Sequence, residues 1–358
     1  MNRWTGAVMA VALALLAGGA LAGKIDFGKT RDGEPLENLP EGTRLISGFG
    51  ERPVFSPDGK KLAFIGRSYG DAFEYDIATG KVRNLTAHTA HAGFLRVHYL
   101  PDGGFLLLGP RRQEADRQVM RISKIEMWWM DKDAEGAILP LDQHVSEGIA
   151  VSRKANRVAW AILHPETSKP EDTVEEYTAI MVAELVMRDG APVLANKREL
   201  VRRPSKDCIL EAQDFRDDDR EVTLSCYDIG GIRLSLGKFG HIVHSAILGV
   251  RVADGTPITY HDIRDGAFNE IEGIGPKGDY SLVDCGPGYG KGLEICRIEL
   301  AAPEHTLTRL THYMNYGAHR VSNGVVSPDG KWMAYQFGRG SDEAGVGMGI
   351  LLGPMPPP

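Results

Sequence analysis

The sequence predicts an all-β protein, a six-bladed β-propeller whose blades are four-stranded antiparallel sheets. The first observation is the pentapeptide Ser-Pro-Asp-Gly-Lys, which occurs at residues 56–60 and again at 327–331. The second is that weaker versions of it lie between the two copies at a spacing of about 45–60 residues, which suits a repeat of four strands. The third is that each copy separates two short apolar runs, as a hairpin turn separates two strands.

The pentapeptide has the chemistry of a tight turn. Pro57 fixes φ at the first corner, Asp58 can bond to its own backbone, and Gly59 adopts positive φ without steric cost. The segment near residue 101 keeps Pro-Asp-Gly, and the one near 276 keeps proline and glycine. Those near 153 and 216 keep only the strand–turn–strand pattern. Six copies of the turn predict six blades.

The first blade shows the full unit, with strands expected at 52–55, 62–65, 73–77 and 82–85. The last blade is one strand short, whereas the segment 43–47 precedes the first blade and resembles the ends of other blades. We therefore expect this N-terminal strand to complete the last blade. That pairing closes the ring and removes the exposed edges of an open sheet.

The repeat also resembles that of a known family. Ser-Pro-Asp-Gly-Lys is followed by an apolar strand, a middle strand, Thr-Gly-Lys at 79–81 and Asn-Leu-Thr at 84–86. This order is similar to the repeat of the TolB-type six-bladed propellers, and the resemblance implies a propeller over nearly the whole mature chain. The N-terminal α/β domain of TolB is not expected here. A prolyl-oligopeptidase-type activity is not expected either, because the chain ends just after the propeller, and its one Gly-x-Ser-x-Gly, at residues 66–70, lies inside the first predicted blade.

The N-terminal segment has the pattern of a secretory signal. Arg3 precedes an apolar run at 7–17, and Ala20-Leu21-Ala22 is a small-x-small cleavage site. We expect cleavage near Ala22, a periplasmic or secreted protein and no transmembrane segment in the mature chain. An uncleaved membrane anchor is the alternative. The expected organisation is a signal peptide, an N-terminal extension, the propeller and a flexible proline-rich tail, at residues 1–22, 23–42, 43–353 and 354–358.

Composition narrows the class of partner. The chain has 358 residues and a formal net charge of −7, which argues against a nucleic-acid binder because such a protein needs a basic face. We expect a monomer whose partner is a protein or a polar small molecule.

The four cysteines, Cys208, Cys226, Cys285 and Cys296, suit an oxidising compartment. Cys208 and Cys226 flank an acidic turn, and Cys285 and Cys296 flank a glycine-rich one, so each pair can face across neighbouring strands. We expect two local disulfides, in blades four and five. Four buried free thiols are the alternative.

The loops predict which face of the ring is functional. The turns between the first and second strands of the blades are uniformly tight, whereas several loops between the second and third strands are long. Such loops open on the opposite face and are the usual place for a binding site on a rigid ring. Arg111, Arg112 and Arg339 lie in them and are candidate ligand-binding residues. Neutral drift of surface loops is the alternative.

The innermost strands add polar residues that are expected to ring the channel. The residues five positions before each turn proline, or before its equivalent, include Arg52, Arg96, Glu211 and Asn323. Glu147, Glu270 and Glu272 are adjacent to other such positions. A ring of this composition suits sugars or peptide termini through charge-assisted hydrogen bonds. The alternative is a wet channel whose polar residues need no ligand.

Histidines suggest a different function. His88, His144 and His312 each lie just past the end of a blade, and His319 lies further along the last of these loops. Converging imidazoles can bind a divalent metal such as Mn or Zn. The arrangement is similar to that of the oligogalacturonate lyases, propeller enzymes with a histidine-bound metal. Histidines are also common in polar loops without any metal.

The sequence thus predicts a TolB-like propeller that binds a partner protein or a polar ligand, such as a saccharide or a peptide, on its long-loop face. The alternative is a metal-assisted lyase or hydrolase of polar oligomers.

Overall fold

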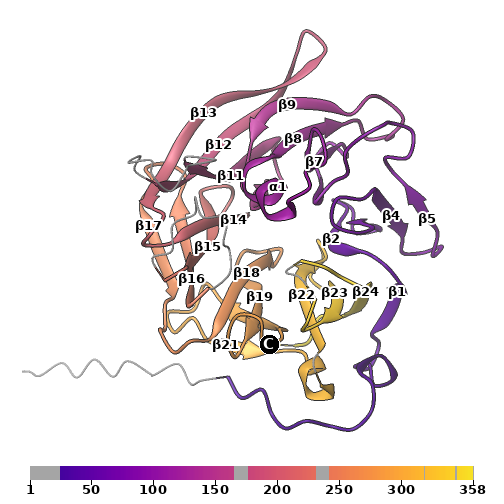
Figure 1. The fold of residues 1–358 in the computed structure, drawn as a ribbon, viewed down its shortest axis with the longest axis vertical. Helices are drawn as coiled ribbons and strands as arrows, with labels where there is room; N and C mark the ends of the chain where they lie inside the picture. The colour runs from indigo at the N-terminus through magenta and orange to yellow at the C-terminus, as the bar shows by residue number, and fades with distance from the viewer. Residues whose placement is uncertain (1–24, 165–175, 231–241, 318, 343–344, 358) are drawn as a thin grey trace, which may run out of the picture.

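A computed structural model describes residues 25–164, 176–230, 242–317, 319–342 and 345–357. Six four-stranded antiparallel sheets surround a common axis, as Figure 1 shows. The fold class is therefore the predicted six-bladed propeller. The signal peptide predicted at 1–22 lies outside the described residues. Within them, no helix has the length and apolar character needed to cross a membrane.

In every blade the strands follow one another outward from the axis. Blade one contains β2 (Glu51–Phe55), β3 (Lys61–Ile65), β4 (Ala72–Asp76) and β5 (Val82–Asn84). Blade two contains β6 (Arg96–Tyr99), β7 (Phe105–Pro110), β8 (Ile125–Met130) and β9 (Leu139–His144), with the short helix α1 (Arg117–Ser123) between β7 and β8. Blade three contains β10 (Ile149–Val151), β11 (Arg157–His164), β12 (Tyr177–Arg188) and β13 (Ala191–Pro204).

The second half of the ring repeats this order. Blade four contains β14 (Ile209–Arg216), β15 (Glu221–Asp228), β16 (His244–Arg251) and β17 (Pro257–His261). Blade five contains β18 (Phe268–Ile274), β19 (Tyr280–Gly286), β20 (Glu294–Glu299) and β21 (Leu307–Arg309). Blade six contains β22 (His319–Val326), β23 (Trp332–Arg339), β24 (Gly349–Pro354) and, outermost, the N-terminal β1 (Arg44–Ser47).

The repeated turn is closed by its own side chains. Ser56 Oγ donates to Asp58 Oδ1 at 2.7 Å and accepts from the Lys61 N–H at 3.0 Å. In the second copy Ser327 Oγ donates to Asp329 Oδ1 at 2.6 Å. Gly59 has a φ of 70°, which is the left-handed conformation that glycine adopts without strain. The turn predicted from the pentapeptide is confirmed in both copies.

The N-terminal strand closes the ring. β1 pairs antiparallel with β24, so it covers the edge that blade six would otherwise expose. The extension before it, which contains the 3-10 turn η1 (Pro35–Glu37), runs along the outside of blades five and six (Figure 1). Asn315 Nδ2 holds this extension by donating to the carbonyl oxygens of Phe27 at 2.8 Å and Lys29 at 2.7 Å. The predicted closure is confirmed.

The other end of the chain is also attached to blade six. β24 continues to Pro354, and the Met355 N–H donates to the Lys331 carbonyl at 2.8 Å. Met355 also packs against the apolar core of blades five and six. The first two residues of the predicted flexible tail are therefore held on the propeller.

The hydrophobic core lies between neighbouring blades. Leu106 of blade two and Trp160 of blade three share one cluster and are both fully buried. Phe64 of blade one and Leu352 of blade six share another. Burying a side chain of this size contributes about 2–3 kcal/mol, so the contacts between blades hold the ring in one geometry.

Both predicted disulfides are present. Cys208 is bonded to Cys226 in blade four and Cys285 to Cys296 in blade five, with Cα atoms 5.5 Å and 5.8 Å apart. These bonds are compatible with a secreted or periplasmic protein.

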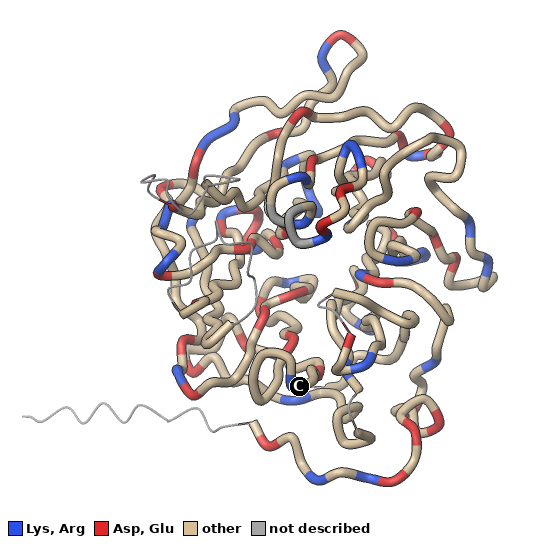
Figure 2. Tube along the Cα trace, in the orientation of Figure 1, with Lys and Arg blue, Asp and Glu red and all other residues tan. Residues whose placement is uncertain are grey.

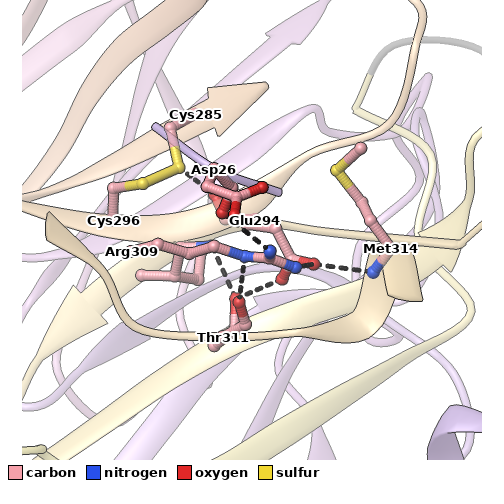
Figure 3. The surroundings of a disulfide bond; sticks show 8 residues. Asp26, Cys285, Glu294, Cys296, Arg309, Thr311 and Met314 are labelled. Atoms are coloured by element: carbon pink, nitrogen blue, oxygen red, sulfur yellow. Dashed lines mark hydrogen bonds and ion pairs between the residues drawn. A yellow bond between two sulfur atoms is a disulfide. The ribbon is translucent and has the colours of Figure 1, made fainter. Parts of the chain in front are cut away.

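A buried carboxylate lies beside the second disulfide, as Figure 3 shows. Glu294 is fully buried and accepts hydrogen bonds from Arg309 Nη2 at 2.7 Å and Thr311 Oγ1 at 2.5 Å. It also accepts from the Met314 N–H at 2.6 Å, at the 3-10 turn η3 (Tyr313–Tyr316). Glu294 thereby fixes the connection from blade five to blade six.

Candidate functional site

Two cavities occupy the channel. The upper cavity, of about 380 Å³, opens among the long loops and is lined by Arg121 of α1, Tyr289 of the β19–β20 loop and Asp342 of the β23–β24 loop. The lower cavity, of about 330 Å³, opens among the tight turns that contain Pro57 and Pro328. Three residues of the innermost strands line both cavities and so lie between them: Arg52, Arg96 and Asn323.

β-Bulges shape the inner strands at this level. The register of β2 shifts between Glu51 and Val54, and that of β22 shifts between Ser322 and Val325. Within these bulges Arg52 and Asn323 have left-handed φ values of 51° and 52°. A bulge redirects the side chains of a strand, which explains how consecutive inner-strand residues reach the channel.

Three arginines surround one carboxylate on the side of blades one and two. Arg52 Nη2 donates to Glu147 Oε1 at 2.7 Å, and Arg121 Nε donates to Glu147 Oε2. Arg96 Nη2 lies 3.9 Å from the same carboxylate and donates to Glu211 Oε1 at 3.2 Å. Burial opposes the charged form of Glu147, but the arginines outweigh it and lower the pKa of Glu147 to about 2. The carboxylate is therefore an anion at neutral pH.

Three acidic side chains gather on the side of blade five. Glu270 and Glu272 occupy alternate positions of β18, and Asp284 lies directly opposite Glu270 on β19. Their carboxylate oxygens lie within 4.8 Å of one another. Burial and the neighbouring carboxylates raise the pKa of each of the three well above its usual value.

The upper cavity therefore joins two regions of opposite charge. Figure 2 shows basic and acidic positions around the axis of the ring. The basic side chains, Arg52, Arg96 and Arg121, come from blades one and two, and the acidic side chains come from blade five. Such an arrangement orients a polar ligand that presents different groups to its two ends.

Several polar atoms of the cavity walls have no hydrogen-bond partner among the described residues. They are the donors Arg52 Nε and Arg96 Nε and the acceptors Asp284 Oδ1 and Asn323 Oδ1, all buried. A buried polar atom without a partner costs about 1–3 kcal/mol. A ligand or an ion that supplied the missing partners would recover this free energy.

Five of the eight predicted ligand-binding residues line the upper cavity, namely Arg52, Arg96, Glu147, Glu211 and Asn323. The other three do not. Arg111 is paired with Glu126, 2.8 Å away, and with Asp142. Arg112 is exposed and paired with Glu114 at 3.0 Å. Arg339 is exposed at the end of β23, where its backbone N–H donates to Asp342 Oδ2 at 2.7 Å.

The structure keeps the four predicted metal-binding histidines apart. His88 Nε2 lies 2.8 Å from the Gly136 carbonyl, and His144 Nε2 lies 3.8 Å from Glu126 Oε1. His319 Nδ1 lies 3.0 Å from the Tyr316 carbonyl, and His312 is exposed. Within the described residues, only the three acids of blade five form a group close enough to share an ion. The histidine-bound metal stays a prediction that these positions do not support.

Sequence reasoning did not single out three further residues of the upper cavity, Arg121, Asp284 and Arg320. Arg121 lies in one of the long loops whose elaboration indicated the functional face. Asp284 reaches the site only through its pairing with Glu270 across two strands, and the sequence alone does not give that register.

Fold and site together define a six-bladed β-propeller with a charged cavity at its long-loop end. No protein-family model matches the sequence, and a search of curated proteins finds no match. Among solved structures, an oligogalacturonate lyase in complex with manganese is 14% identical, with a TM-score of 0.48, and the match covers 82% of this chain and 74% of that one.

Two peptidases have comparable propeller folds. A prolyl endopeptidase is 10% identical, with a TM-score of 0.48 and coverage of 82% of this chain and 40% of that one. An acylaminoacyl peptidase of Pyrococcus horikoshii is 12% identical, with a TM-score of 0.48 and coverage of 80% and 42%. This chain thus spans less than half the length of either peptidase. The likeness concerns the fold alone.

Proposed function

We propose that the protein binds a small polar ligand in the upper cavity, and that this ligand carries carboxylate or hydroxyl groups, as an acidic saccharide or a short peptide does. One observation carries the proposal: buried donors and acceptors that have no partner among the described residues belong to side chains lining the same cavity. Arg52 and Arg96 supply the donors, and Asp284 and Asn323 supply the acceptors. A polar ligand satisfies both kinds at once.

Size and position support a small ligand. A volume of about 380 Å³ falls within the usual range of small-molecule sites, roughly 300–1,000 Å³. Guanidinium groups bind carboxylates through paired, charge-assisted hydrogen bonds. Arg52 and Arg96 are held by Glu147 and Glu211, so they are oriented before the ligand arrives and little side-chain entropy is lost on binding.

Two other functions predicted from the sequence rank below this one. A partner protein would have to insert a chain end or a loop into the same cavity, which makes it a special case of a peptide ligand. A metal-assisted lyase or hydrolase would need His88, His144, His312 and His319 near the ligand. Their described positions do not bring them together, so binding without histidine chemistry is favoured.

The test is calorimetric titration of the mature protein with two sets of probes, acidic oligosaccharides and tripeptides. Arg96→Met removes the guanidinium from the cavity, and Arg112→Met is the matched control because Arg112 is exposed and outside it. We expect one set of probes to bind wild type with saturation and Arg96→Met to bind at least about ten-fold more weakly. The proposal fails if neither set binds, or if the two variants bind alike.

A further inference from the structure

We propose that Glu270, Glu272 and Asp284, together with the side-chain oxygen of Asn323, form a binding site for one divalent cation, and that the site prefers Ca²⁺. This inference deepens the proposed function, because the ion would form part of the wall of the ligand cavity. Glu270 and Asp284 line the upper cavity, Glu272 lines the lower one, and Asn323 lines both.

The spacing of the oxygen atoms fits a single calcium ion. One carboxylate oxygen from each acid lies within 4.8 Å of the others. Calcium–oxygen distances are about 2.3–2.6 Å, so oxygens on opposite sides of one Ca²⁺ ion lie up to about 5 Å apart. Mg²⁺ usually keeps several waters and binds through one or two carboxylates, so a set of four protein oxygens favours Ca²⁺. An all-oxygen donor set disfavours softer ions such as Zn²⁺.

A cation would relieve the repulsion between these three acids. Glu270 and Asp284 are directly paired across β18 and β19, and like charges in such pairs destabilise a sheet. Asp284 is 1% exposed and Glu272 is 7% exposed, so water screens them little. Among the described residues, no lysine, arginine or histidine forms an ion pair with any of the three carboxylates. Arg52 and Arg121 donate instead to Glu147, and Arg96 donates to Glu211.

Asn323 is an independent observation that also points to an ion. It comes from blade six and is 8% exposed, and its backbone N–H donates to Asp284 Oδ2 at 2.9 Å. Its Nδ2 donates to Glu272 Oε1 at 2.9 Å, whereas its Oδ1 has no partner. The two ends of a side-chain amide are exchangeable by rotation. Rotation would place Oδ1 against Glu272, and a cation bound between the two oxygens would make that contact favourable.

The site would connect the ion to the ligand. Three carboxylates and one amide oxygen supply at least four of the six to eight oxygens that Ca²⁺ takes. The remaining positions would be filled by water or by a carboxylate or hydroxyl oxygen of the ligand. The ion would thus convert the acidic side of the cavity into a second attachment point for the same class of ligand.

The experiment titrates chelator-stripped mature protein with CaCl₂, MgCl₂ or MnCl₂ alone, by calorimetry, without any organic ligand. We expect one calcium site in wild type and at least about ten-fold weaker binding in Asp284→Asn. Asp342→Asn is the matched control, because it removes a carboxylate from the same cavity but outside the group, and it should bind calcium within about three-fold of wild type. Absence of saturable calcium binding in wild type overturns the proposal. So does an equal loss in the two variants.

Melting temperatures show whether a variant has lost calcium binding or has failed to fold. Without calcium, Asp284→Asn should melt no lower than wild type, because it relieves repulsion with Glu270. With calcium, wild type and Asp342→Asn should gain stability, whereas Asp284→Asn should not. An equal gain from the organic dication 1,2-diaminoethane would overturn the metal site. Failure of the proposed function is distinguishable, because calcium would then still bind while no saccharide or peptide probe does.

Discussion

Arg52 Nη2 lies 2.7 Å from Glu147 Oε1 and donates a hydrogen bond to it. Arg52 belongs to the innermost strand of blade one, whereas Glu147 lies in the segment that leads into blade three. The bond therefore passes over blade two and joins parts of the ring that share no sheet. Arg121 of α1 donates to the same carboxylate. Glu147 is the common acceptor on which the basic side of the upper cavity depends.

Replacing Glu147 with glutamine should lower stability more than a typical surface change. The substitution removes the one carboxylate that contacts both Arg52 and Arg121, whose charges would remain close together in a poorly hydrated place. Breaking a buried pair in this way costs about 3–5 kcal/mol, and we expect about 3 kcal/mol here. Urea denaturation measures the effect, with Asp58→Asn in an exposed turn as the control. A loss below about 1 kcal/mol would show that the cluster does not hold the ring.

The contribution of Glu147 should disappear in acid. Its pKa of about 2 in the folded protein lies below its usual value of 4.5. The unfolded chain therefore takes up the proton first as the pH falls, so the stabilisation is complete above about pH 5 and is lost between about pH 4.5 and 2. The difference in stability between wild type and Glu147→Gln should shrink over this range. A constant difference from pH 6 to pH 3 would contradict the low pKa.

Removing the closing strand should damage the fold, whereas removing only the extension before it should not. A mature chain lacking residues 25–47 loses β1 and exposes the edge of β24, which favours association between molecules. A chain lacking only 25–40 keeps β1 and is the control. We expect the longer deletion to aggregate in light scattering and the shorter one to stay soluble. Equal behaviour of the two would mean that closure by β1 is dispensable.

Each disulfide should stabilise the protein measurably. The cysteines of the two bonds are 18 and 11 positions apart, and closing loops of this length contributes about 3 kcal/mol each. Paired Cys→Ala replacement, one bond at a time, should lower the midpoint of chemical denaturation. Peptide mapping without reduction should recover Cys208 linked to Cys226. A different pairing, or double replacement without loss of stability, would contradict this expectation.

The sequence was most informative about the fold where local chemistry decides the structure. A Pro-Asp-Gly turn forms in nearly any context, so the two pentapeptides located hairpins of the first and last blades. Segment 43–47 was recognisable as a spare strand because the last blade lacked one, and β1 at Arg44–Ser47 confirms that reading.

The site was harder to predict because it depends on pairings between distant segments. Arg52 and Asn323 were found by counting back from the turns, which works along one strand. Counting along one strand does not find Asp284, because Asp284 lies opposite Glu270 only through the pairing of β18 with β19. Arg111 and Arg112 lie in the loop that supplies Arg121, but they form ion pairs elsewhere. The direction of a loop residue depends on tertiary contacts that no local pattern encodes.

The most direct measurement is a crystal structure of the mature protein with the probe that binds most tightly, grown with calcium chloride. The account predicts the ligand in the upper cavity, with a carboxylate or hydroxyl oxygen about 3 Å from a guanidinium nitrogen of Arg52 or Arg96. Density for the ligand in the lower cavity, or outside the channel near Arg111, Arg112 and Arg339, would contradict it.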